Sequence, residues 1–155
     1  MSEPDDPMTR IGQGTELGHR GERAAARDLF VKVWDGFGGE AGDPLYRCAL
    51  AHSMADVQDD AAEELKWDLR ALEAADSLTD ERAAHAGVAS PVAGFYPSLH
   101  LNLAECYRKL GDLQRAREHV RRGIAAVGTL GDDSYGRMIK GGLDRLAERL
   151  TSDRP

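Results

Sequence analysis

The chain has 155 residues, of which 41% are hydrophobic and 30% charged, and its formal net charge is −7. This composition predicts one globular domain that buries its own core, and it argues against a disordered chain. The N-terminus MSEPDDPM lacks the apolar stretch of a signal peptide, and no apolar run is long enough to cross a membrane. We therefore expect a cytoplasmic protein, and its richness in Arg, Ala, Gly and Asp favours a bacterial, GC-rich origin.

The first half of the sequence predicts two pairs of helices behind a short tail at residues 1–8. Apolar residues recur with helical spacing over about 9–20 and again over about 21–36, where a cluster of glycines ends the second helix. A third helix is expected after the Asp-Pro dipeptide at position 43, and a fourth after the Asp-Asp pair at position 59. No segment shows the alternation of a strand, so the expected fold class is all-α.

The second half predicts an insertion, a third helix pair and a final helix. Residues 77–97 are expected to form a short helix that Thr79 caps and Gly87 ends, followed by an extended loop with two prolines. The large apolar residues of this loop should fold back onto a repeat. The third pair lies at about 97–130 and reverses at a Gly-Asp turn. The final helix carries apolar residues at Tyr135, Ile139, Leu143, Leu146 and Leu150.

Helix pairs that recur about every 34 residues are typical of solenoid repeats. Residues 97–130 match the pattern of a tetratricopeptide repeat (TPR) through Leu103, Ala104, Tyr107, Gly111, Ala116, Val120 and Gly123. Residues 7–40 match it more loosely, through Gly14, Leu17, Gly21, Ala26 and Phe30. Residues 42–76 match it least, because a QDD sequence replaces the turn glycine and only Ala49 and Ala61 remain as packing residues. The chain therefore resembles a small bacterial TPR protein with three repeats.

The resemblance implies a right-handed α-solenoid of antiparallel helix pairs with a C-terminal capping helix. A single domain would span residues 9–150. Its expected parts are repeats at about 9–40, 42–76 and 97–130, an insert at 77–97 and a capping helix at 132–150, followed by a tail at 151–155.

In such a solenoid, the first helices of the pairs line a groove that holds a peptide or a partner helix. The resemblance places six residues in this groove, namely Tyr46, Leu50, Ser53, Leu101, Glu105 and Arg108. This mixture suits a partly apolar segment with few charges. An alternative stays open, in which Tyr46, Leu50 and Leu101 pack against the insert of the same chain.

A basic segment suggests a second function class. Residues 108–122 contain six basic and two acidic residues, and phosphate groups of a nucleic acid could be bound there by Lys109, Arg115, Arg121 and Arg122. The net acidity of the chain and the lack of aromatic residues for base stacking argue against this alternative. Residues 35–81 hold 13 acids and three bases, so docking between two copies is also open. Our main hypothesis is a protein–protein interaction module, and the alternative is a nucleic-acid-associated regulatory protein.

The remaining polar residues do not form a recognised catalytic or metal-binding pattern. The five histidines lack the spacing of metal ligands, and the paired acids fall at predicted helix starts, where carboxylates cap backbone amides. Cys48 and Cys106 are isolated in the sequence and are expected to be buried thiols. We therefore expect no enzyme activity, no metal and no cofactor.

Overall fold

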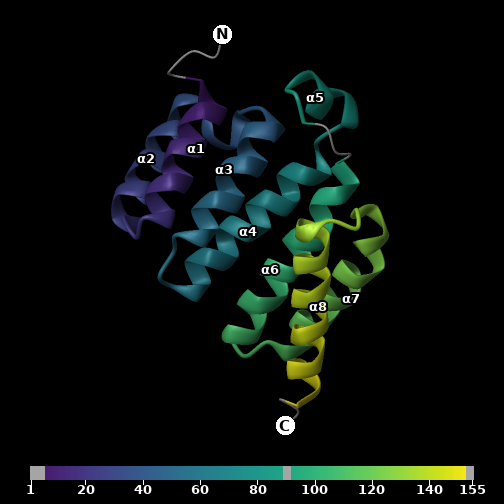
Figure 1. Ribbon diagram of the computed structural model, residues 1–155. Coiled ribbons are helices and arrows are strands. Elements are labelled where there is room, and N and C mark those ends of the chain that lie inside the picture. The colour runs from purple at the N-terminus through teal and green to yellow at the C-terminus, as the bar shows by residue number, and fades with distance from the viewer. Residues whose placement is uncertain (1–5, 89–91, 153–155) are drawn as a thin grey trace. The chain divides into compact units, whose positions relative to one another are not determined.

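The computed structural model describes residues 6–88 and 92–152, which form eight α-helices and three short 3-10 helices and contain no strand (Figure 1). The expected all-α fold class is thus confirmed. The chain divides into two compact units, Met1–Leu78 and Thr79–Pro155. The first unit contains α1 (Pro7–His19), α2 (Arg23–Gly36), η1 (Gly39–Ala41), α3 (Pro44–Asp56) and α4 (Ala61–Asp76). The second contains α5 (Asp80–His85), η2 (Val92–Phe95), α6 (Tyr96–Lys109), α7 (Leu113–Ala126), η3 (Val127–Thr129) and α8 (Ser134–Ser152).

Two of the helix pairs reverse at a glycine in the left-handed backbone conformation. Gly21 has φ of +83°, and the next backbone N–H, that of Glu22, donates to the carbonyl oxygen of Leu17 at 2.9 Å. Gly111 has φ of +84°, and the same type of bond joins Asp112 to Tyr107 at 2.9 Å. Each turn therefore satisfies carbonyl groups at the end of its first helix without outside help. Both glycines were predicted as turn residues, and their positive φ confirms this.

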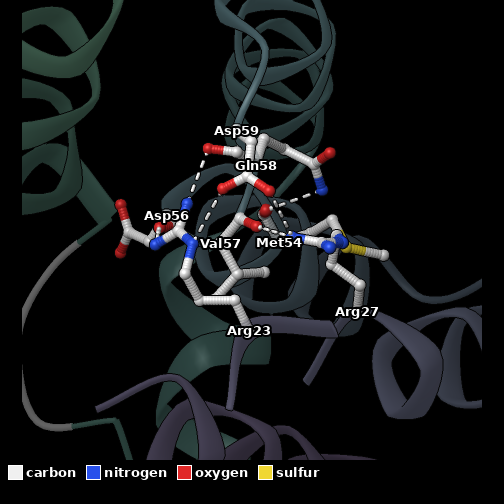
Figure 2. Close-up of polar contacts among 7 residues, drawn as sticks. All are labelled: Arg23, Arg27, Met54, Asp56, Val57, Gln58 and Asp59. Atoms are coloured by element: carbon white, nitrogen blue, oxygen red, sulfur yellow. Dashed lines mark hydrogen bonds and ion pairs between the residues drawn. The ribbon is translucent and has the colours of Figure 1, made fainter. Parts of the chain in front are cut away.

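The turn between α3 and α4 has no glycine and is held by two arginines of α2 (Figure 2). The guanidinium group of Arg23 donates to the carbonyl oxygens of Asp56 at 3.3 Å and Gln58 at 2.7 Å. Arg27 donates to the carbonyl oxygen of Val57 at 2.7 Å. Both arginines also form ion pairs with the carboxylate of Asp59. The carbonyl groups left by the end of α3 thus obtain their donors from the preceding helix pair.

The apolar core of the first unit lies between the α1–α2 pair and α3. Its buried members are Ile11, Ala26, Phe30, Val33, Leu50, Met54 and Val57. Helix α1 approaches α2 closely because Gly14 has no side chain, and a Cβ atom there would lie 2.7 Å from Cζ of Phe30. Phe30 is completely buried as a result.

The second helix pair does not follow the predicted register. Ala49 and Ala61, the expected packing residues, are only partly buried. Ala51 in α3 and Ala71 in α4 are completely buried instead. Ala49 still packs against the core of the first unit, but the completely buried small residues of this pair stand at other positions than those expected.

In the second unit, α8 packs against the α6–α7 pair. The core between them consists of Ala104, Ala116, Val120, Leu146 and Leu150. Gly123 of α7 allows close approach, because a Cβ atom there would lie 2.7 Å from Cδ2 of Leu143. Most of the predicted apolar row of α8 is buried, but Tyr135 is 49% exposed and does not belong to it.

The segment before α6 is more helical than predicted. The side-chain oxygen of Thr79 accepts a hydrogen bond from the N–H of Arg82 at 3.1 Å, which confirms the predicted cap of α5. The expected extended loop is wrong for Val92–Phe95, which form η2, while residues 89–91 lie outside the described residues. The backbone N–H of Val92 donates to Asp80 at 2.8 Å, and η2 is in contact with η3. Part of the insert therefore folds back onto η3, the segment that follows the α6–α7 pair, as predicted.

Replacement of Gly14 by alanine tests the close approach of α1 and α2. The added methyl group would overlap the ring of Phe30, so we expect the free energy of unfolding to fall by about 1 to 3 kcal/mol. Gly12→Ala is the matched control on the same helix, because no atom lies within 4 Å of a Cβ there. This control should gain about 0.5 to 1 kcal/mol from helix propensity. Urea denaturation of both variants measures the difference, and equal effects would contradict the assigned packing.

Replacement of Arg23 by methionine tests the turn between α3 and α4. The variant keeps the apolar stem but removes the donors to two carbonyl groups, and we expect a loss of about 1 to 3 kcal/mol of unfolding free energy. Arg20→Met is the control, since Arg20 only pairs with the exposed Glu16 one turn away. Its effect should stay below about 0.5 kcal/mol. Chemical denaturation compares the two variants, and a similar loss in both would refute the role of Arg23.

Candidate functional site

A groove lies between α6 and α8 in the second unit. The two helices come close where Gly142 faces Leu101, because a Cβ atom on Gly142 would lie 2.9 Å from Cδ2 of Leu101. The groove has a volume of about 370 Å³. Its lining residues are Leu101, Asn102 and Glu105 from α6, and Gly142, Arg145, Leu146 and Arg149 from α8. Two of the predicted groove residues, Leu101 and Glu105, thus lie in one groove with the four lining residues of α8.

The groove carries an excess of positive charge. Arg108, a third predicted residue, is largely covered and donates two hydrogen bonds to the carboxylate of Glu105, the shorter at 2.6 Å. These bonds, helped by the nearby charges of Lys109 and Arg149, lower the pKa of Glu105, so its carboxylate stays ionised. Arg145 and Arg149 are exposed, and neither forms an ion pair with another residue in 6–88 or 92–152. Since Arg108 neutralises Glu105, these two guanidinium groups give the groove its net positive charge.

The three predicted groove residues of α3 are differently placed. Leu50 is completely buried in the core between α3 and the α1–α2 pair, so it offers no surface to a partner. The ring of Tyr46 lies beside that of Phe37, with the centroids 5.8 Å apart. This row of α3 therefore packs largely against α2 and the segment that follows it. The groove assignment of Leu50 is wrong because the row on which it lies faces the preceding helix pair.

Ser53 lines a much smaller pocket between α1 and α3. Its hydroxyl group lies 3.4 Å from that of Thr15, and the pocket has a volume of about 80 Å³. Asp56 forms part of the rim, and partial desolvation raises the pKa of its carboxyl group, while electrostatic interaction with His52, His19 and Arg23 partly opposes this rise. The pocket has room for a few water molecules and is several times smaller than the groove between α6 and α8.

The contribution of α8 to the groove was not predicted from the sequence. We interpreted this helix only as a cap, so Arg145 and Arg149 were not among the candidate residues. A signal was available, because the two arginines are four residues apart and thus fall on one side of the helix. A helical pattern alone does not reveal, however, that this side faces Leu101.

An aromatic cluster in the first unit was also missed. The rings of Trp34 and Trp67 meet edge to face with centroids 5.2 Å apart. The guanidinium group of Arg70 lies over Trp67, 4.3 Å from the ring centroid, and forms an ion pair with Glu40. This cation already occupies the aromatic face, so the cluster serves to join α2 and α4.

The predicted basic patch on α6 and α7 is mostly paired within its own helices. Arg115 pairs with Asp112 at 2.7 Å, and both Arg121 and Arg122 pair with Glu118. Arg117 donates to the carbonyl oxygen of Leu150, and Lys109 also has an interaction within the chain. The charge that these residues present to a phosphate group is therefore smaller than their number indicates.

Two buried histidines, His100 of α6 and His119 of α7, lie side by side. Their Nδ1 atoms are 3.0 Å apart, so one imidazole donates a hydrogen bond to the other. The two rings are stacked between Tyr96 and Tyr107. Burial lowers the pKa of His119, and the charge of Arg122 lowers it further, so the His119 imidazole is neutral at pH 7.

The two cysteines are buried, as predicted. Burial raises the pKa of Cys48 to about 11, so its thiol is protonated at neutral pH and is a poor nucleophile. Among the described residues, no group of three or more His, Cys, Asp and Glu side chains is placed to hold a metal ion.

Comparisons of this chain with protein-family models, with curated proteins and with solved structures gave no match. No helix within residues 6–88 and 92–152 has both the length and the apolar character needed to cross a membrane.

The histidine pair makes stability depend on pH. Because the pKa of His119 is lower in the folded chain than in the unfolded one, the unfolded chain binds more protons below about pH 6.5. The stabilising contribution is therefore fully present above this pH and is lost as the pH falls. We expect His119→Gln to lower the free energy of unfolding at pH 7.5 but to reduce its dependence on pH between 7.5 and about 5.

His85→Gln serves as the control for this experiment, because His85 is exposed on α5. This variant should keep the pH dependence of the natural chain. Urea denaturation at a series of pH values measures both. If the free energy of unfolding of His119→Gln changes with pH as steeply as that of the natural chain, the histidine pair does not control the loss of stability in acid.

Proposed function

We propose that this protein is a helical-repeat interaction module of the TPR type, which binds a segment of another protein in the groove between α6 and α8. The observation that carries the proposal is the composition of the groove. Leu101 supplies apolar surface beside the buried Leu146, and Arg145 and Arg149 stand at the rim without an ion-pair partner among the described residues. Apolar anchors with charges at the rim are the usual arrangement of a protein-binding site.

The helix pairs give further support to the TPR assignment. In each unit, one helix packs with an apolar row against a preceding antiparallel pair: α3 against α1–α2, and α8 against α6–α7. The turn glycines at 21 and 111 and the buried alanines Ala26 and Ala116 occupy equivalent places in their pairs. A right-handed solenoid is the arrangement that this repetition favours.

The alternative of nucleic-acid binding has less support. Asp112 and Glu118 already pair with three of the four residues proposed for the basic patch. Binding through phosphate contacts would also fall steeply with salt, so salt dependence separates the two hypotheses.

Replacement of Leu101 by alanine tests the proposed function. The immobilised chain is incubated with the native lysate, and retained proteins are identified by mass spectrometry at low and at physiological salt. We expect Leu101→Ala to reduce the retained partner at least fivefold, which corresponds to about 1 kcal/mol. The variant should lose less stability than truncation of a completely buried leucine, because Leu101 is only partly buried where it packs against the core.

Leu103→Ala is the matched control on the same helix. Leu103 is completely buried, and its truncation should cost about 2 to 5 kcal/mol of stability. If Leu101→Ala behaves in the same way, Leu101 is a core residue and the groove assignment fails. Retention of nucleic acid that disappears at physiological salt would support the alternative function instead.

A further inference from the structure

One side of α8 carries a row of residues that extends the groove beyond its present lining. The residues follow one another at intervals of three and four positions, so they fall on a single side of the helix. We call this row the α8 face, and it consists of Tyr135, Met138, Gly142, Arg145 and Arg149.

We propose that the α8 face binds an amphipathic helix of another protein, which carries acidic residues in its N-terminal half and apolar residues in its C-terminal half. The inference rests on the proposed function and adds the chemistry, length and direction of the bound segment.

The N-terminal end of the α8 face is apolar and exposed. Tyr135 is 49% and Met138 is 58% exposed, although most of the other apolar residues of this helix are buried. A flexible methionine next to an aromatic ring suits contact with apolar side chains of varied shape. Solvent exposure of two large apolar groups on one row has an energetic cost that a bound partner would remove.

The C-terminal end of the α8 face is cationic. Arg145 and Arg149 lie one helical turn apart, beside the groove floor of Leu101 and Leu146. Asp144 of the same helix falls on another side, Glu148 has an interaction of its own within the chain, and Glu105 across the groove is held by Arg108. The two guanidinium groups are therefore available to carboxylates that are themselves one turn apart on a partner helix.

Leu101 of α6 covers Gly142 in the middle of the α8 face, so a partner helix would meet an apolar side chain there. The row from Tyr135 to Arg149 spans 15 residues, or about 21 Å of helix, so a partner of about four turns would match it. Intervals of three and four residues are also the spacing that packs well against a second helix.

The direction of the partner follows from helix dipoles. An antiparallel helix places its N-terminus beside the C-terminal end of α8, where Arg145 and Arg149 lie. Carboxylates are favourable near a helix N-terminus, so acidic residues at this end stabilise the partner helix and also pair with the arginines.

Two designed peptides of identical composition test the proposal. The direct peptide has two glutamates one turn apart near its N-terminus and two leucines on the same side near its C-terminus, in a helix-forming background of alanine and glutamine. The reversed peptide carries the leucines first and the glutamates last. Binding of each fluorescent peptide to the full chain is measured by anisotropy at low salt. We expect the direct peptide to bind at least about tenfold more tightly than the reversed one.

Variants of the chain assign this binding to the α8 face. The double substitution Arg145→Glu and Arg149→Glu should abolish the preference for the direct peptide, and Met138→Ala should weaken its binding several-fold. The control is Arg121→Glu with Arg122→Glu on α7, which changes the net charge equally but lies outside the α8 face. Circular dichroism should show unchanged helix content in all variants, because the substituted side chains are exposed.

Several results would overturn the proposal. These are equal affinity for the two peptides, no binding of either at about 100 µM, or an equal loss of binding in the α7 control. Self-association of the chain that depends on Met138 would assign the α8 face to a second copy instead. If Leu101→Ala loses the lysate partner while the Arg145 and Arg149 double variant retains it, the proposed function stands and this inference fails.

Discussion

The need of helix-terminal carbonyl groups for hydrogen-bond donors shapes both units of this protein. Each helix pair reverses within a few residues, so the last carbonyl groups of its first helix lie close to the next helix start. Gly21 and Gly111 meet the need locally, because a left-handed backbone returns N–H groups to these carbonyls. The α3–α4 turn has no such residue and takes its donors from Arg23 and Arg27. The turn of the second pair thus depends on side chains of the first pair.

Local signals were sufficient to predict most helix boundaries, but they did not predict the packing of α3. Capping residues such as Asp60 and Thr79 act within a single turn, so their effect can be read from neighbouring residues. Helix α3 buries apolar residues on more than one side, because it contacts α4 as well as the α1–α2 pair. Apolar periodicity does not then distinguish one packing side from another. The misplacement of Leu50 and of the alanine register follows from this ambiguity.

The candidate site could be predicted only in part, for a similar reason. The first-helix pattern put Leu101 and Glu105 on one side of α6, and both line the groove that α6 forms with α8. The arginines of α8 belong to a terminal helix, where exposed charges are expected whether or not they bind anything. Their importance comes from Leu101, which is distant in sequence. The pairing of Arg115 and Arg121, in contrast, was accessible from the sequence, since Asp112 and Glu118 lie three residues before them.

Charge differs between the two units in a way that bears on partner choice. Residues 1–78 hold 17 acids and eight bases, whereas residues 79–155 hold ten acids and 12 bases. An acidic segment is therefore repelled by the first unit and attracted by the second, and the first unit also disfavours a nucleic acid. Specificity of this kind arises from repulsion as well as from attraction. The unequal charge of the two units would direct an acidic partner helix to the groove and the α8 face, and away from the smaller pocket beside Ser53.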